Sequence, residues 1–138
     1  MNIKVYEDLY EALKKYNDEL PENYGNEVYD DVVKLPYTLD NSFPLTIFQE
    51  INNVSNSRFM SPIERISTVG YTLAVYSTDK GQITNKKIAR ELAEQLDNFL
   101  TLCGLTRISY NSNRLDNGVY YIILTYTGNL YENKSILI

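Results

Sequence analysis

A change of hydrophobic period in the middle of the chain constrains the fold more than any other feature. From about residue 63 to residue 77, apolar residues occupy alternate positions, as in a strand with one buried face. From about residue 85 to residue 103, they recur every three or four positions, which indicates an amphipathic helix. We expect the apolar stripe of this helix to pack on a sheet that contains the strand. The stripe consists of Ile88, Leu92, Leu96, Phe99 and Cys103, and the sheet face includes Leu73, Val75, Ile122 and Leu124.

Two helices are expected in all, and the long one carries signals at both ends. Thr84 or Asn85 can cap its first turn. Gly104 follows its last turn, where a left-handed residue commonly ends a helix. A second amphipathic helix is predicted for residues 3–16, with acidic residues early and lysines late, as the helix dipole favours.

The segment between the two predicted helices contains further strands. Residues 28–35, which end before Pro36, and residues 45–51 are the strand candidates that precede the long strand. Residues 52–61 are rich in Asn and Ser and are expected to form a loop. Gly70 indicates a bulge or a bend within the long strand.

A hairpin is expected after the long helix. Residues 105–111 and 119–126 are its strands, and the sequence Asp116-Asn117-Gly118 favours a turn between them. Both faces of the second strand are apolar or aromatic, which predicts a central strand covered on both sides. Residues 1–138 therefore form a single α+β domain: an N-terminal helix, a mixed or antiparallel β-sheet packed against one long helix, and a C-terminal β-hairpin.

The composition leaves little for catalysis. A chain of 138 residues can bury a core without disulfides or metals. It contains no histidine, which excludes Ser-His-Asp and Cys-His catalysis and His-ligated zinc. Its six glycines are scattered and form no phosphate-binding loop. Cys103 lies in the helix stripe, which favours a core residue over a reactive thiol. We expect no catalytic residue, no metal site, no cofactor and no enzymatic activity.

The charge and hydropathy of the chain restrict its partners. The formal net charge is −5, which argues against a surface that neutralises phosphates or anionic lipids. No apolar run is long enough for a membrane span, and the first residues lack a signal-peptide pattern. We therefore expect a protein made in the cytoplasm that does not bind membranes.

Two groups of charged residues deserve a structural test. Glu91, Glu94 and Asp97 follow one another along the long helix and could share a cation, although a solvated helix surface is the simpler interpretation. Four arginines are dispersed in the sequence but can gather in space: Arg58, Arg65, Arg107 and Arg114.

Several junctions occur in a characteristic order. The long strand Val69–Ser77 precedes the helix, the helix ends in Cys103-Gly104-Leu105, and the hairpin carries Asn117-Gly118-Val119-Tyr120-Tyr121 before a Tyr-rich strand. In this order, over about residues 1–130, the chain resembles the tail terminator (tail-completion) proteins of long-tailed bacteriophages.

The resemblance implies a structural role. Proteins of that family form a ring, usually a hexamer, that caps the tail tube and joins it to the head-side connector. The implied partners are further copies of the chain, the tail tube protein and the connector or stopper protein. Genomic DNA would pass through the lumen without sequence-specific binding, and the protein would reside in the tail or neck of the virion after assembly in the host cytoplasm. The alternatives are another head–tail connector protein, such as a stopper or adaptor, and a small host α+β module that binds a protein or a ligand.

Apolar residues in polar surroundings are the candidates for a subunit or tail-tube interface. Phe59 and Met60, beside Arg58, lie within the predicted loop and either fold back onto the domain or dock on a neighbour. We also expect Tyr37 and Phe43 to contribute to such an interface.

Overall fold

A computed structural model describes residues 4–30, 43–55, 66–115 and 118–131. These residues form two helices and one five-stranded sheet. The elements, in chain order, are α1 (Lys4–Asp18), β1 (Glu27–Tyr29), β2 (Leu45–Ser55), β3 (Ile66–Ser77), α2 (Asn85–Leu102), β4 (Thr106–Arg114) and β5 (Tyr120–Tyr131).

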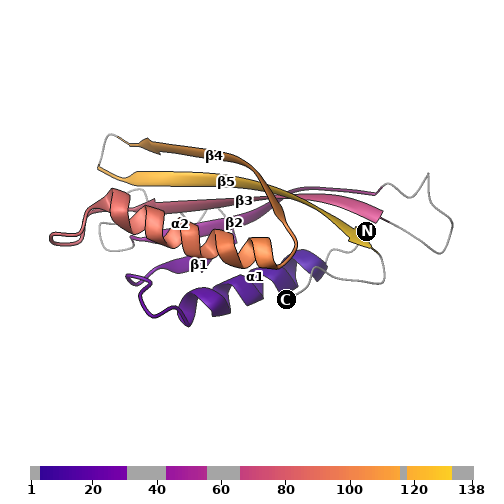
Figure 1. The fold of residues 1–138 in the computed structure, drawn as a ribbon, viewed down its shortest axis with the longest axis horizontal. Coiled ribbons are helices and arrows are strands. Elements are labelled where there is room, and N and C mark those ends of the chain that lie inside the picture. Colours follow the sequence, from indigo (N-terminus) through magenta and orange to yellow (C-terminus); the bar gives the residue numbers. More distant parts are fainter. Residues whose placement is uncertain (1–3, 31–42, 56–65, 116–117, 132–138) are drawn as a thin grey trace.

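The sheet is open and mixed, and its strand order is β1-β2-β3-β5-β4. β1 pairs with β2 in parallel, whereas the other three pairs are antiparallel. Both helices lie on one face of the sheet, α1 below β1 and β2 and α2 below β3 and β5 in the view of Figure 1. The α+β class, the N-terminal helix, the long helix and the C-terminal hairpin predicted from the sequence are confirmed.

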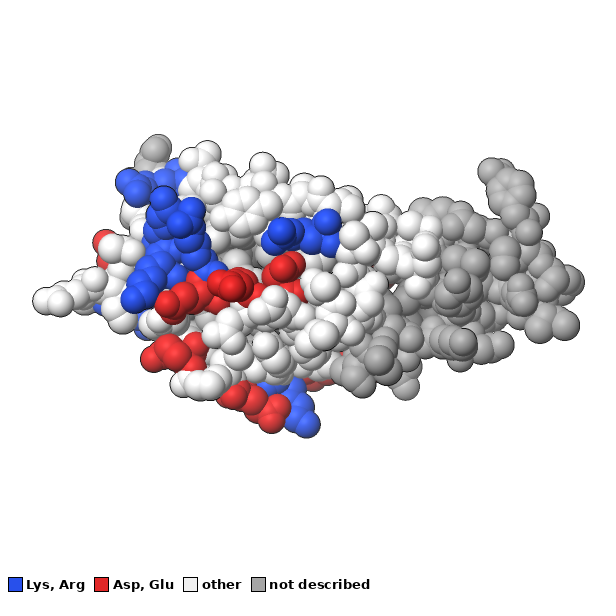
Figure 2. All heavy atoms as spheres, viewed as in Figure 1, with Lys and Arg blue, Asp and Glu red and all other residues white. Residues whose placement is uncertain are grey.

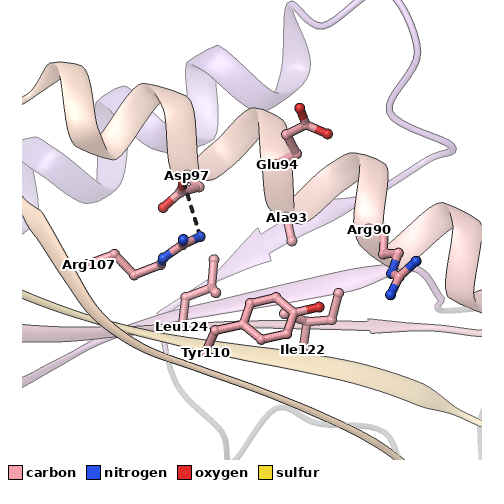
Figure 3. A pocket seen from close by; sticks show the side chains of 8 residues that line it. All are labelled: Arg90, Ala93, Glu94, Asp97, Arg107, Tyr110, Ile122 and Leu124. Atoms are coloured by element: carbon pink, nitrogen blue, oxygen red, sulfur yellow. Dashed lines mark hydrogen bonds and ion pairs between the residues drawn. The ribbon is translucent and has the colours of Figure 1, made fainter.

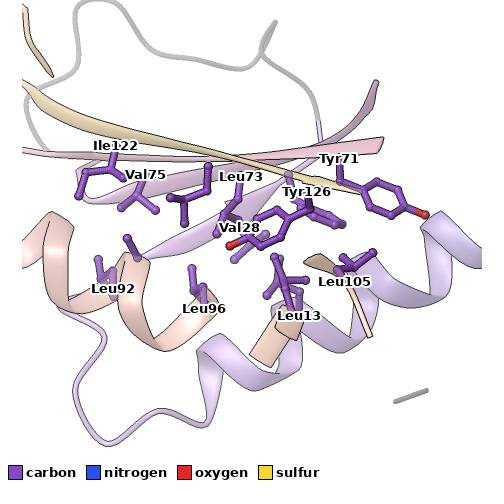
Figure 4. Close-up of a cluster of buried hydrophobic side chains, with 14 of the residues drawn as sticks. Leu13, Val28, Tyr71, Leu73, Val75, Leu92, Leu96, Leu105, Ile122 and Tyr126 are labelled. Atoms are coloured by element: carbon purple, nitrogen blue, oxygen red, sulfur yellow. The ribbon is translucent and has the colours of Figure 1, made fainter. Parts of the chain in front are cut away.

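The core lies between the helix layer and the sheet. The predicted helix stripe is buried there, with only Phe99 partly accessible. It packs on alternating residues of β3 and β5, as Figure 4 shows for Leu92 and Leu96 beneath the strands. The predicted sheet partners Leu73, Val75, Ile122 and Leu124 all belong to this core.

Hydroxyl groups attach α1 to the sheet. Tyr6 donates a hydrogen bond of 2.5 Å to the carbonyl of Phe48, and Tyr10 donates one of 3.0 Å to the carbonyl of Val28. The ring of Tyr6 also stacks on those of Phe48 and Tyr71, at centroid distances of 5.6 and 6.0 Å. Each tyrosine therefore supplies apolar contact and satisfies a strand carbonyl at once.

A buried amide network joins the end of α1 to the first strands. The side chains of Asn17 and Asn26 bond to each other, and Asn17 also donates to the carbonyl of Asn26 at 2.8 Å. The hydroxyl of Thr46 donates to Asn26 at 2.9 Å. All three residues are at most 2% exposed. Because every amide is paired, the network fixes the turn after α1 without the cost of an unsatisfied buried polar group.

The start of α2 is held by polar contacts from three directions. Thr84 is the N-cap, and its side chain accepts a bond from the backbone N–H of Lys87. The backbone N–H of Asn85 donates to Asp79 at 2.6 Å, and its side chain donates to the carbonyl of Gly118 in the β4–β5 turn at 2.8 Å. At the other end of α2, Gly104 adopts a φ of 100°, as the predicted stop requires.

Two strand predictions before the long strand need correction. The first strand is only Glu27–Tyr29, and Asp30 already lies in a bend; residues 31–36 lie outside the described residues. Residues 52–55, predicted as part of a loop, belong to β2 and pair with β3. The backbone pairing of these residues with β3 outweighs the low strand propensity of Asn. The bulge expected at Gly70 exists, but its extra residue is Ile51 on β2, opposite Gly70.

The hairpin also differs from its prediction. β4 continues to Arg114, beyond the predicted end at residue 111, because its residues keep pairing with β5. β5 is central, as predicted, and both helices lie on one face of it. On the opposite face, Tyr121, Ile123 and Thr125 are partly accessible among the described residues, whereas Ala74, which pairs with Ile123, is buried.

We expect Leu96→Ala to lower the free energy of unfolding by about 2–5 kcal/mol, because the side chain is fully buried between α2 and the sheet. Urea denaturation followed by circular dichroism measures this loss. Leu102→Ala is the control on the same helix: Leu102 is 79% exposed, so its truncation should change the stability by less than about 0.5 kcal/mol. Equal losses in the two variants would contradict the packing described here.

Buried tyrosines predict a loss of stability at alkaline pH. Burial raises the pKa of Tyr6, Tyr71 and Tyr126 in the folded state. The unfolded chain releases these protons near pH 10, so the stability is complete below that pH and falls as the pH rises above it. The urea midpoint should therefore decline above about pH 10, and Tyr71→Phe should make that decline less steep.

The same variant separates a paired from an unpaired hydroxyl. The hydroxyl of Tyr71 is buried and has no hydrogen-bond partner among the described residues. Tyr71→Phe should therefore stabilise the protein by about 1 kcal/mol at pH 7. Tyr126→Phe is the matched control: it removes a bond to Asp97 and should cost about 1.5–3 kcal/mol. A larger loss in Tyr71→Phe than in Tyr126→Phe would refute this assignment.

Candidate interaction surface

The edge strand β4 is the part of the sheet that the helices leave open. An α-helix with its side chains is about 10 Å wide and strands lie about 4.8 Å apart, so two helices cover about four strands. α1 and α2 cover β1, β2, β3 and β5, and all nine residues of β4 are exposed. Ile108 and Tyr110 are 61% and 46% exposed, which is unusual for large side chains on a strand. Within the described residues, no strand pairs with the outer side of β4.

A groove lies between α2 and this edge strand, and we call it the α2–β4 groove. It encloses about 220 Å³. Figure 3 shows Tyr110 lying across Ile122 and Leu124 on the sheet side, with the Arg107–Asp97 pair at one end and Arg90 at the other. The complete lining is Arg90, Ala93, Glu94, Asp97, Arg107, Tyr110, Ile122 and Leu124.

The acidic end of the groove is internally neutralised. Asp97 accepts a hydrogen bond of 2.6 Å from the hydroxyl of Tyr126 and lies 3.5 Å from the guanidinium of Arg107. Burial, together with the bond to Asp97, raises the pKa of Tyr126, so its hydroxyl stays protonated and remains a donor at neutral pH. This end of the groove therefore offers little free charge to a partner.

The opposite end gathers cations. Lys86 and Arg90 lie one helical turn apart on α2, and Lys86 and Arg114 line a second hollow of about 400 Å³ at the start of that helix. We call Lys86, Arg90 and Arg114 the basic cluster; all three are exposed, and none forms an ion pair with another described residue. Figure 2 shows lysine and arginine side chains massed at this end of the upper edge. Asp79 lines the hollow with Lys86 and Arg114, and Glu94 lines the groove with Arg90. The three cations outnumber these two carboxylates and are available to an acidic partner.

Of the interface residues predicted from the sequence, the structure describes only Phe43. Tyr37, Arg58, Phe59 and Met60 lie outside the described residues, and so does Arg65. Phe43 is half-buried and lies two residues before β2, a strand that β3 and β5 separate from β4. Of the four arginines that could gather in space, Arg107 and Arg114 both lie on β4.

The acidic residues of α2 do not share one site. Glu91 accepts a hydrogen bond from the hydroxyl of Tyr24, in the turn after α1, whereas Glu94 and Asp97 face the α2–β4 groove. In the part of the chain that the structure describes, no group of three or more Cys, Asp or Glu side chains is placed to hold a metal ion. Cys103 is buried, and burial raises the pKa of its thiol to about 11, as expected of a core residue.

The sequence analysis did not identify Arg90 and Tyr110 as residues of an interaction surface, although both line the α2–β4 groove. The sequence did contain a sign of an exposed apolar patch on β4, because Ile108 and Tyr110 are large side chains in a segment otherwise rich in Ser, Asn and Thr. What was absent from the sequence was the strand order, which places this segment at the edge of the sheet.

Comparison with protein-family models returns no match, and comparison with curated proteins returns no significant one. Among the described residues, neither helix is long and apolar enough to cross a bilayer.

Proposed function

We propose that this protein is a structural subunit of a bacteriophage tail, a terminator that forms a ring on the tail tube and joins it to the head-side connector. The observation that carries the proposal is the open sheet with an exposed edge strand, β4, in a domain whose order of elements agrees with the one the resemblance implies. It acts by assembly and needs no catalytic residue or cofactor.

The exposed edge supports a protein partner. A long edge strand with unpaired backbone groups is a liability in a monomer, and soluble proteins usually cover or interrupt it. Here the edge extends over nine residues, with Tyr110 and Ile108 exposed upon it. Tyrosine and arginine, which both occur along this strand, are residues that protein–protein interfaces favour.

The opposite face of the sheet supports the proposed relation to DNA. On β2–β5, the described residues that point away from the helices carry no charge. They include Gln49, Thr72, Tyr76, Asn111, Tyr121 and Thr125. The described residues of this face offer no cations to phosphates, and the whole chain is acidic, which supports the passage of DNA without binding.

The proposed partners are further copies of the chain, the tail tube protein and the head-side connector protein, and the proposed location is the tail or neck of the virion. A stopper or adaptor at the same junction is the nearest alternative, and a small host module that binds a protein or ligand is the more distant one. A tube-capping ring differs from both because it should bind isolated tail tubes.

We expect the concentrated protein to form a closed oligomer, most simply a hexamer, that dissociates on dilution. Light scattering coupled to size-exclusion chromatography measures its mass, and electron microscopy of the protein mixed with isolated tail tubes shows whether a ring sits on the tube end. A compact monomer at every concentration, together with bare tube ends, would contradict the proposal.

A further inference from the structure

The two edges of the sheet carry opposite charge. Residues 4–30, which form α1 and β1, hold eight acidic and three basic side chains, a net charge of −5. Residues 79–115, which form α2 and β4, hold six basic and four acidic ones, a net charge of +2. β1 and β4 are the first and last strands of the sheet order, so the two charges lie at opposite sides of the molecule.

The acidic side is exposed in the same way as the basic cluster. Glu7 and Glu11 lie one turn apart on α1, and both are exposed, as are Glu27 on β1 and Asp30 just after it. The hydroxyl of Tyr10 on α1 donates a hydrogen bond of 3.0 Å to the carbonyl of Val28, which joins α1 to β1, the strand that Asp30 follows. We call Glu7, Glu11, Glu27 and Asp30 the acidic edge.

We infer that copies of this chain bind head to tail, with the basic cluster of one subunit, at the α2–β4 groove, against the acidic edge of the next. The inference rests on the proposed ring function and adds to it the two faces that meet. The acidic edge and the basic cluster lie too far apart to form ion pairs within one subunit. In a cyclic assembly, the basic cluster of each subunit can face the acidic edge of the next. A contact between two different faces propagates in one direction, and it closes into a ring when the rotation per subunit allows.

The alternative arrangements are disfavoured by the same charges. A two-fold contact through the β4 edge would place one basic cluster against another, and a two-fold contact through α1 and β1 would oppose two acidic edges. Like charges that face each other in a contact oppose association. The head-to-tail contact avoids both.

Two charge-reversal variants test the inference. Arg90→Glu with Arg114→Glu reverses the basic cluster, and Glu7→Lys with Glu11→Lys reverses the acidic edge. All four side chains are exposed, so both variants should fold, which circular dichroism checks. Each variant alone should self-associate at least about a hundredfold more weakly than the unmodified chain, because like charges then meet. Lys14→Glu with Lys15→Glu is the control, since it changes the net charge as much as the first variant but leaves the basic cluster intact and should still assemble.

Mixing the two variants distinguishes the geometry. In an equimolar mixture, the two unmodified faces can meet and the two reversed faces can also meet, so copies of the two variants should alternate in assemblies larger than a dimer, as measured by light scattering. A chain that carries all four substitutions should recover assembly, since both faces are reversed together. Assembly that survives in both single-edge variants, or a mixture that stays monomeric while the unmodified chain assembles, would overturn the inference and leave the proposed ring intact. An unmodified chain that never assembles, alone or on tail tubes, would instead overturn the proposed function and the inference with it.

Discussion

The width of the helix layer determines which surfaces this protein can offer. Two helices bury their apolar faces against four of the five strands, and the core is complete when they do so. The fifth strand, β4, is held by its ladder to β5, and its contact with α2 includes the ion pair between Arg107 and Asp97. The exposed edge and the α2–β4 groove follow from this mismatch between two helices and five strands.

The parts of the fold that the sequence predicted are those whose burial leaves a periodic signal. The main packing contact joins α2 to the sheet, and the sequence predicted both of its sides. The apolar stripe of the helix contains Leu92 and Leu96, the alternating apolar residues of β3 include Leu73 and Val75, and all four lie in one core cluster. The full length of β2 was not predictable, because residues 52–55 form a strand only through their pairing with β3. The strand propensities of these residues do not show that a pairing strand lies beside them.

The candidate surface depended on information that lies outside any local window. The pairing of Asn17, Asn26 and Thr46 and the approach of Lys86 to Arg114 join residues from separate elements. The positions of these residues in the sequence do not indicate that they lie close together. The charge asymmetry, in contrast, is visible in the sequence as an acidic segment over residues 4–30 and a weakly basic one over residues 79–115. Its meaning requires the strand order, which places the two segments at opposite edges of the sheet.

Hydrogen exchange of the backbone amides of β4 tests the central claim most directly, because an edge strand presents its unpaired N–H groups to water. In the dilute protein, we expect the amides on the outer side of β4 to exchange quickly, while those of β3, which is paired on both sides, exchange slowly. After assembly at high concentration, protection should appear along β4 and along the acidic edge, with little change in β3. An assembled protein in which β4 exchanges as fast as before, while another surface becomes protected, would contradict the account.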